Sequence, residues 1–214
     1  MASFDWDSYW AHKDESRSAQ EFAVKLAKML RCFIEDETIW RMADYGCGPA
    51  TTLFALAAAL PDVSFYGYDV AGSVVEKNTS KARSLGLRNL FFRQDRLPNP
   101  KNVEKFGLVT CFSTLHYTED IEQALRDLYG LVEGGGYLIF NYPNRYTRKM
   151  YVREIKPGDE EMRRRFYLVL EGRNLLSVKA IEGILGVRPL RFYSSRRSNP
   201  YVVASKGKSR PRGF

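Results

Sequence analysis

The chain has 214 residues, of which 44% are hydrophobic and 27% are charged, and its formal net charge is +8. This composition is ordinary for a globular protein, and the length suits one domain with a sizeable core. No apolar run approaches the ~20 residues that a membrane-spanning helix needs. The first residues lack the basic start and apolar core of a secretory signal. Three scattered cysteines (Cys32, Cys47, Cys111) without a Cys-x-x-Cys pair predict reduced thiols in a cytoplasmic protein and no structural metal.

The positive charge is concentrated in the last third of the chain. Residues 145–214 hold 18 Lys/Arg and 6 Asp/Glu, a net charge of +12, whereas residues 1–144 hold 15 and 19, a net charge of −4. A one-sided basic region indicates an anionic partner or substrate. The alternative is a solvated basic face that serves solubility alone.

Aromatic side chains beside acids open the chain, at residues 4–10, and a helix is predicted from about Ser16 to Phe33. Its apolar residues recur at helical spacing, and Ser16 and Ser18 are both suitable N-caps.

The segment from Ile39 to Leu60 is the organising element of the sequence. A strand ends in Asp44-Tyr45, a turn with Gly46 and Gly48 follows, and an Ala/Leu-rich helix begins at Thr51. Glycine reaches unusual backbone angles and lets a ligand lie against the main chain. A P-loop would end in Gly-Lys-Ser/Thr, and a dinucleotide fingerprint would place a third glycine at position 51; neither is present.

The next units repeat a strand followed by an acid. A strand over residues 63–69 ends in Asp69, a helix follows over 71–85, and a strand over 90–93 precedes Asp95. A carboxylate at the end of the second strand can accept hydrogen bonds from ribose hydroxyls. Asp95 follows the third strand in the same way and could contact a ligand there, and its alternative role is to cap the loop that begins at this point.

The remaining elements complete the alternation. We expect a buried strand over 106–112, a helix over 119–132, a glycine turn over 133–136 and a strand over 137–142. Alternating strands and helices predict a doubly wound, mostly parallel sheet, whose ligands bind beyond the carboxyl ends of the strands. A basic, aromatic-rich segment over 143–176 follows as a largely helical, lid-like insertion, with a surface excursion as its alternative. A helix from Ser177 to Leu185 and a hairpin of residues 188–195 and 201–205 end the domain, which spans 1–205. Residues 206–214 are expected to form a disordered basic tail.

The motif from Asp44 to Ala50, with Asp69, resembles the first motif and the ribose acid of class I S-adenosylmethionine-dependent methyltransferases. The third glycine of the family motif is Ala50 here. Asp95, with Arg96 beside it, matches the position of the family's acid that accepts a hydrogen bond from the adenine amino group of the cofactor. The resemblance covers residues 39–142 well and implies a terminal antiparallel strand, an N-terminal helix over the cofactor and S-adenosylmethionine as that cofactor. Leu115-His116-Tyr117 after the fourth strand is similar to the small-molecule methyltransferases of the family, and the Asn/Asp-Pro-Pro-Tyr signature of amino-methyltransferases is absent.

These patterns give a set of candidate site residues. His116 is the candidate general base, because histidine titrates near neutrality, with a structural role as its alternative. The resemblance implies that an aromatic residue ahead of the N-terminal helix touches the methionine end of the cofactor, which Tyr9 and Trp10 would do here; their alternative role is to anchor the segment on the core. The candidate cofactor-binding residues are Asp44, Gly46, Cys47, Gly48, Asp69, Val70, Asp95, Arg96, Phe112, Ser113, Tyr9 and Trp10. The candidate substrate-binding residues are Tyr117, Arg145, Tyr146 and Arg148.

Three functions are compatible with this sequence. The first is methyl transfer to a small or lipid-like anionic acceptor that the arginines of the lid-like insertion recognise. The second is methylation of RNA or a protein, with the basic third following phosphates or an acidic surface. The third is a cofactor-binding partner subunit without activity of its own. Oligomeric state is not predicted.

Overall fold

The computed structural model describes residues 4–13, 15–192 and 197–207. A seven-stranded sheet of order β3-β2-β1-β4-β5-β7-β6 forms its centre, parallel except for β7, which is antiparallel to both of its neighbours. This arrangement confirms the predicted doubly wound fold. The strands are β1 (Arg41–Tyr45), β2 (Ser64–Asp69), β3 (Leu90–Gln94), β4 (Phe106–Cys111), β5 (Val132–Asn141), β6 (Leu190–Phe192) and β7 (Tyr201–Ser205).

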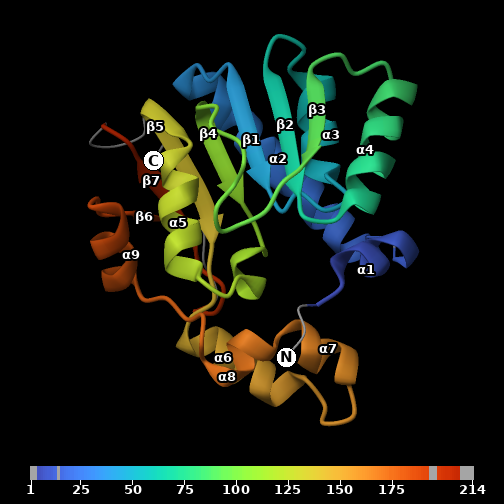
Figure 1. Cartoon of the computed structure of the whole chain (residues 1–214). Helices are drawn as coiled ribbons and strands as arrows, with labels where there is room; N and C mark the ends of the chain where they lie inside the picture. Colours follow the sequence, from blue (N-terminus) through green and yellow to red (C-terminus); the bar gives the residue numbers. More distant parts are fainter. Residues whose placement is uncertain (1–3, 14, 193–196, 208–214) are drawn as a thin grey trace.

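Helices cover both faces of the sheet (Figure 1). Side chains of α2 and α3 pack with Met42, Phe65 and Leu108 on one face, and those of α5 and α9 pack with Val109 and Phe140 on the other. The helices are α1 (Trp6–His12), α2 (Arg17–Glu37), α3 (Thr51–Ala59), α4 (Gly72–Ser84), α5 (Ile121–Gly130), α6 (Arg145–Glu154), α7 (Glu160–Arg165), α8 (Tyr167–Glu171) and α9 (Val178–Leu185), with the 3-10 helix η1 (Leu115–Tyr117). No helix among the described residues combines the length and the apolar character needed to cross a membrane.

Local chemistry starts most of these helices. Side-chain oxygens of Asp5, Ser16, Asp120, Asp159 and Ser177 accept hydrogen bonds from amides in the first turn of the helix that each precedes. Such caps satisfy backbone donors that have no partner within the helix. The caps at Ser16 and Ser177 agree with the sequence. Helix α1 is an additional element, which we expected only as an aromatic segment.

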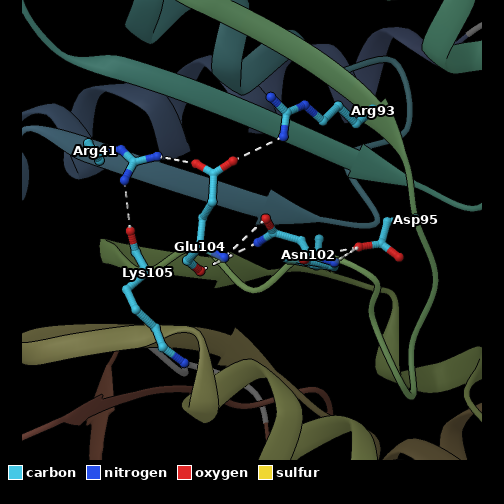
Figure 2. Close-up of polar contacts among 7 residues, drawn as sticks. Arg41, Arg93, Asp95, Asn102, Glu104 and Lys105 are labelled. Atoms are coloured by element: carbon cyan, nitrogen blue, oxygen red, sulfur yellow. Dashed lines mark hydrogen bonds and ion pairs between the residues drawn. The ribbon is translucent and has the colours of Figure 1, made fainter.

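An extended strap over residues 95–105 connects β3 to β4, where a βαβ unit would ordinarily place a helix. Figure 2 shows Glu104 between Arg41 and Arg93, with which it forms ion pairs. The Arg41 guanidinium also lies 5.2 Å from the Tyr66 ring centroid and 5.1 Å from that of Phe106. The hydrogen bonds from both arginines hold the pKa of Glu104 below its ordinary value. These contacts hold the strap in place without a helix.

The glycine segment over 133–136 differs from the prediction. These residues lie within β5, in an irregularity of its pairing with β4: Phe106 pairs with Val132, whereas Leu108 pairs with Tyr137. The amide of Gly135 donates to the carbonyl of Lys206 at 2.6 Å, so the segment adds a contact beyond β7. A Cβ on Gly136 would lie 2.7 Å from the Gly107 carbonyl oxygen, which explains the need for glycine there.

Lys206 was expected at the start of the basic tail, and it is instead anchored. Its amide donates to the Gly136 carbonyl at 2.9 Å, and its ammonium donates to the carbonyls of Tyr129 and Val132 at 3.1 Å and 2.8 Å. Residues 208–214 of the predicted tail, and 193–196 of the predicted hairpin, lie outside the described residues.

Candidate active site

The turn between β1 and α3 is fixed to the end of β2. The amides of Gly46 and Cys47 both donate to the Tyr68 carbonyl, at 2.7 Å and 3.1 Å. Gly46 and Gly48 have φ angles of +75° and +49°, which strain any residue with a side chain. A Cβ on Gly46 would also lie 1.9 Å from the Thr114 hydroxyl oxygen. The turn therefore requires glycine for its backbone shape and for its close approach to Thr114.

Asp69 joins this turn to the neighbouring strand. Its carboxylate accepts hydrogen bonds from the amides of Gly48, at 2.9 Å, and Ala71, at 3.0 Å. The side-chain amide of Asn78 donates to the Gly48 carbonyl at 2.7 Å, so the turn is held from both sides. Burial raises the pKa of Asp69, because the charged form loses water. Each carboxylate oxygen has two acceptor positions, so both oxygens can still accept a further hydrogen bond.

Asp44 lies beneath the turn. Only 8% of the residue is exposed, and Oδ1 accepts a hydrogen bond from the Thr110 hydroxyl at 2.7 Å. Burial raises its pKa to about 7, against the opposing effect of that hydrogen bond, and repulsion from Asp69 adds to the rise. Above about pH 7, where Asp44 has lost its proton, Asp44 and Asp69 together concentrate negative potential around the turn.

The end of β4 completes the same edge of the sheet. Ser113 has a φ of +56°, which is uncommon for a residue other than glycine, and its amide donates to Oδ1 of Asn141 at 2.6 Å. Such conformations cluster at functional sites. Phe112 is half-buried, with its ring 5.7 Å from that of Tyr201.

Helical segments cover this edge from two directions. Figure 1 shows α6, α7 and α8 beyond the carboxyl ends of the strands, with α1 to one side. A Cβ on Gly48 would lie 3.3 Å from the Trp10 indole, so α1 closes directly over the glycine turn. Helix α1 is tied to α4, because Asp7 accepts a hydrogen bond from the Ser73 amide at 2.9 Å and Lys77 donates to the Trp10 carbonyl at 2.8 Å.

A family model described as a methyltransferase domain matches residues 43–138, which contain the glycine turn, Asp69 and the end of β4. Residues 43–138 of this chain carry a class I S-adenosylmethionine-dependent methyltransferase domain. The predicted family and cofactor are thereby confirmed.

Solved structures of other methyltransferases share the fold. An O-methyltransferase family protein from Burkholderia thailandensis matches with a TM-score of 0.64 and 16% identity over 97% of this chain and 64% of its own. Magnesium protoporphyrin IX methyltransferase from Synechocystis, solved with bound S-adenosylhomocysteine, matches with a TM-score of 0.63 and 17% identity over 94% of this chain and 92% of its own. An N-methyltransferase from Bradyrhizobium japonicum, also solved with S-adenosylhomocysteine, matches with a TM-score of 0.61 and 13% identity over 94% of this chain and 96% of its own. At these identities the likeness concerns the fold alone.

The glycine turn of this methyltransferase suits its cofactor. Two glycines at positive φ leave main chain uncovered by Cβ atoms, and the adjacent Asp69 keeps acceptor positions available for ribose hydroxyls. Cys47 contributes its backbone to the turn through the hydrogen bond from its amide to the Tyr68 carbonyl. Burial raises the pKa of its thiol well above the ordinary value and keeps the thiol neutral. Val70 and Arg96 are exposed at the same edge.

The geometry of Asp95 supports its loop-capping alternative. Its carboxylate accepts hydrogen bonds from the amides of Arg96 (2.8 Å), Lys101 (2.9 Å) and Asn102 (3.1 Å) and from the Tyr45 hydroxyl (3.4 Å). Figure 2 shows its link to Asn102 on the strap. These four donors occupy the four acceptor positions of a carboxylate, so little capacity remains for an adenine amino group.

His116 has surroundings that favour its structural alternative. It is 2% exposed, and Nε2 lies 2.8 Å from Oδ1 of Asn199 in the turn before β7. Burial lowers its pKa to about 4, so the ring is neutral at physiological pH. Asn174 donates to the carbonyl of His116 at 2.7 Å and so fixes the backbone of η1. A buried, weakly basic imidazole is a poor proton acceptor.

The predicted substrate-binding residues differ in how they are held. We call α6, α7 and α8, which lie beyond the carboxyl ends of the strands, the cover. Tyr117 lies at the end of η1, under this cover, with its ring centroid 4.6 Å from that of Trp6. Arg148 is exposed and donates to the Leu170 carbonyl at 2.8 Å, which joins α6 to α8. Arg145 is exposed, and its guanidinium donates to the Tyr146 hydroxyl at 2.7 Å. Each of the two arginines therefore gives one hydrogen bond within the cover, and the rest of its guanidinium is exposed.

Residues that we had not selected complete the site. Asn141, at the end of β5, holds Ser113, and the rule that ligands bind at the carboxyl ends of strands could have identified it. Glu15, ahead of α2, accepts a hydrogen bond from the Thr51 hydroxyl at the start of α3. Arg165 lies at the end of α7 beside Tyr9, and no short sequence motif marks it.

Proposed function

We propose that this methyltransferase transfers the methyl group of S-adenosylmethionine to a small or lipid-like acceptor that carries negative charge. One observation supports the anionic acceptor above all: the cover over the carboxyl edge is basic. Residues 143–174 hold nine Lys/Arg and five Asp/Glu, a net charge of +4, and they follow directly after β5. Arginine suits carboxylates and phosphates because its planar group donates two parallel hydrogen bonds.

Glycine-turn residues and Asp69 hold the cofactor in this proposal. The main chain of Gly46, Cys47 and Gly48 lies against it, and the Asp69 carboxylate accepts hydrogen bonds from its ribose hydroxyls. Asp44, Val70, Phe112 and Ser113 line the surroundings, and Tyr9 and Trp10 close over them. Asp95 and Arg96 lie at the same edge of the sheet, where they form the start of the strap. When bound, the cofactor supplies an electrophilic methyl group.

The chain contributes mainly by orienting the acceptor and excluding water. Orientation alone can supply up to roughly 7–11 kcal/mol of the barrier. The pKa of His116 is lowered to about 4 and that of Tyr117 is raised by burial, so neither group is suited to take up a proton at neutral pH. We therefore propose that the acceptor reaches the site with its nucleophilic atom already free to react.

Methylation of RNA or a protein is the second candidate, because residues 145–214 carry a net charge of +12. It predicts RNA binding that weakens steeply with salt. A partner subunit without activity is the third candidate, and methyl transfer by the purified chain alone would exclude it.

The decisive test uses S-adenosylmethionine with a labelled methyl group and an acceptor extract separated into RNA, protein, lipid and small-molecule fractions. We expect label in the small-molecule or lipid fraction. Label in RNA or protein would replace the first proposal by the second.

The matched control is Asp69→Ala, which also tests the ribose assignment. Charged hydrogen bonds are worth roughly 1.5–3 kcal/mol each. Loss of two should weaken the binding of S-adenosylhomocysteine about a hundredfold or more, as measured by calorimetry. Affinity equal to that of the wild type would refute the role of Asp69.

A further inference from the structure

Arg165 lies within a cluster of aromatic side chains under the cover. Its guanidinium carbon is 5.3 Å from the ring centroid of Tyr9 and 4.9 Å from that of Phe166. The Phe166 ring lies 5.2 Å from that of Tyr117, which in turn lies 4.6 Å from Trp6. Three segments that are distant in sequence, α1, η1 and the α7–α8 junction, thus bring their aromatic rings together, and two of these rings, Tyr9 and Phe166, lie against the guanidinium.

The guanidinium is only partly satisfied by its neighbours. Nη1 donates to the Tyr9 hydroxyl at 2.6 Å, whereas Nη2 meets the sulfur of Met162 at 2.7 Å. A thioether is a weak acceptor. Nε is buried and has no hydrogen-bond partner among the residues that the structure describes. The edge formed by Nε and Nη2 therefore has no oxygen acceptor, although this edge fits the two oxygens of a carboxylate.

The charge of Arg165 also lacks a counter-ion within the described segments. None of the ion pairs among the described parts of the chain includes it, whereas the neighbouring contact between α1 and α7 is an ion pair of Lys13 with Glu161. A partly buried, unpaired cation is costly unless an anion joins it. Burial raises the pKa of Tyr117, so that hydroxyl stays neutral beside the cluster and can donate to an anion as well.

The cluster adjoins the glycine turn. The rings of Tyr9 and Trp10 have centroids 4.9 Å apart, and Trp10 lies against Gly48. Tyr117 follows β4 through η1, three residues after Thr114, whose hydroxyl lies against Gly46. An acceptor bound among these rings would therefore lie next to the cofactor-binding turn.

We propose that Arg165 binds the carboxylate of the methyl acceptor through its Nε and Nη2 edge, and that the acceptor is an aromatic carboxylic acid whose ring packs among Tyr9, Tyr117 and Phe166. The flexible thioether of Met162 gives way to the carboxylate. This inference rests on the proposed function, since it describes the acceptor side of the same site.

The experiment measures binding of benzoate and of benzamide to the full chain saturated with S-adenosylhomocysteine. The two probes share a ring, and only benzoate carries the charge. Titration can follow Trp6 and Trp10 fluorescence or heat. We expect benzoate to bind the wild type at least tenfold more tightly than benzamide, and Arg165→Met to remove that difference. Arg164→Met, an exposed arginine of the same helix, is the matched control and should keep it.

Equal affinity of the wild type for the two probes would overturn the inference, as would retained discrimination in Arg165→Met. If Arg165→Met fails to fold, Arg165→Lys decides, because lysine keeps the charge and lacks the planar edge. We expect it to bind benzoate at least several-fold more weakly than the wild type does, and unchanged affinity overturns the inference. S-adenosylhomocysteine binding separates the two levels: its absence in the wild type would refute the proposed function, whereas its presence without discrimination refutes only the acceptor assignment.

Discussion

Replacing Asp44 by asparagine should stabilise the ligand-free protein, although Asp44 lies in the candidate site. The folded protein holds the Asp44 proton up to about pH 7, whereas the ordinary pKa is 3.8. The stability contributed by this carboxyl is therefore complete below the ordinary pKa and is lost as the pH rises through 7. Asparagine carries no charge to desolvate, and its Oδ1 can still accept the hydrogen bond from Thr110.

The size of the effect follows from the same two values. A difference of about 3 pKa units corresponds to about 4 kcal/mol, at about 1.4 kcal/mol for each unit. This figure includes the repulsion from Asp69 and is the upper limit of the gain for Asp44→Asn at pH 8. The gain should be smaller at pH 5, where the folded protein still holds the proton. Cofactor binding should weaken in the same variant, because the cofactor is cationic.

Guanidinium denaturation of the ligand-free protein at pH 5 and pH 8 measures this gain directly. Asp62→Asn, at an exposed carboxylate in the turn before β2, is the matched control and should change the free energy of unfolding little. Because His116 titrates in both proteins, its contribution cancels between the variant and the wild type. A gain that is absent, or that is the same at both pH values, would refute the assignment of a strained buried charge at Asp44.

The glycine turn and His116 provide two further predictions. Gly46→Ala and Gly86→Ala both place a Cβ at positive φ, +75° and +67°, but only the first meets Thr114, at 1.9 Å, whereas the second has nothing within 4 Å. Gly86→Ala should cost about 1 kcal/mol of unfolding free energy and Gly46→Ala clearly more, and equal losses by denaturation would contradict the steric argument. His116→Ala should lower the melting temperature about as much as Asn199→Ala does, because both remove the same hydrogen bond. It should leave the pH profile of methyl transfer unchanged near pH 6.5. A hundredfold loss of kcat at unchanged stability would instead make His116 the general base.

Predictions from sequence were most accurate where the cause is local. The strand, glycine turn and helix from β1 to α3 follow from residue types within a few positions, and so does α9, which begins after Ser177 and ends before Gly186. The parallel direction of β1 to β5 was predicted from the alternation of elements, whereas their order in the sheet was not predicted. Helix α1 was not predicted because it has only seven residues and no buried face of its own. Its stability comes from contacts with α4 and α7, which lie far along the chain.

The roles of individual acids were harder to predict, because they depend on which donors fold toward them. Asp69 and Asp95 both follow a parallel strand, so the sequence suggests ligand contacts for both. The structure distinguishes them by their partners. Asp69 accepts hydrogen bonds from two backbone amides and keeps free acceptor positions, whereas Asp95 is saturated by three strap amides and the Tyr45 hydroxyl. A strap without a helix exposes its amides, and a buried carboxylate is a suitable group to bind them.

The anion-binding role of the arginines in the cover was equally hard to predict from sequence. Arg145 and Arg148 come first after β5 and were the natural candidates for binding an anion, yet both already donate hydrogen bonds within the cover. Arg165 resembles Arg163 and Arg164 in sequence, and only the meeting of α1 with α7 places it between aromatic rings with an unpaired Nε. An anion site of this kind depends on which donors remain unsatisfied after folding. That property cannot be read from residue type or spacing, because it is fixed by the hydrogen bonds of every neighbouring group.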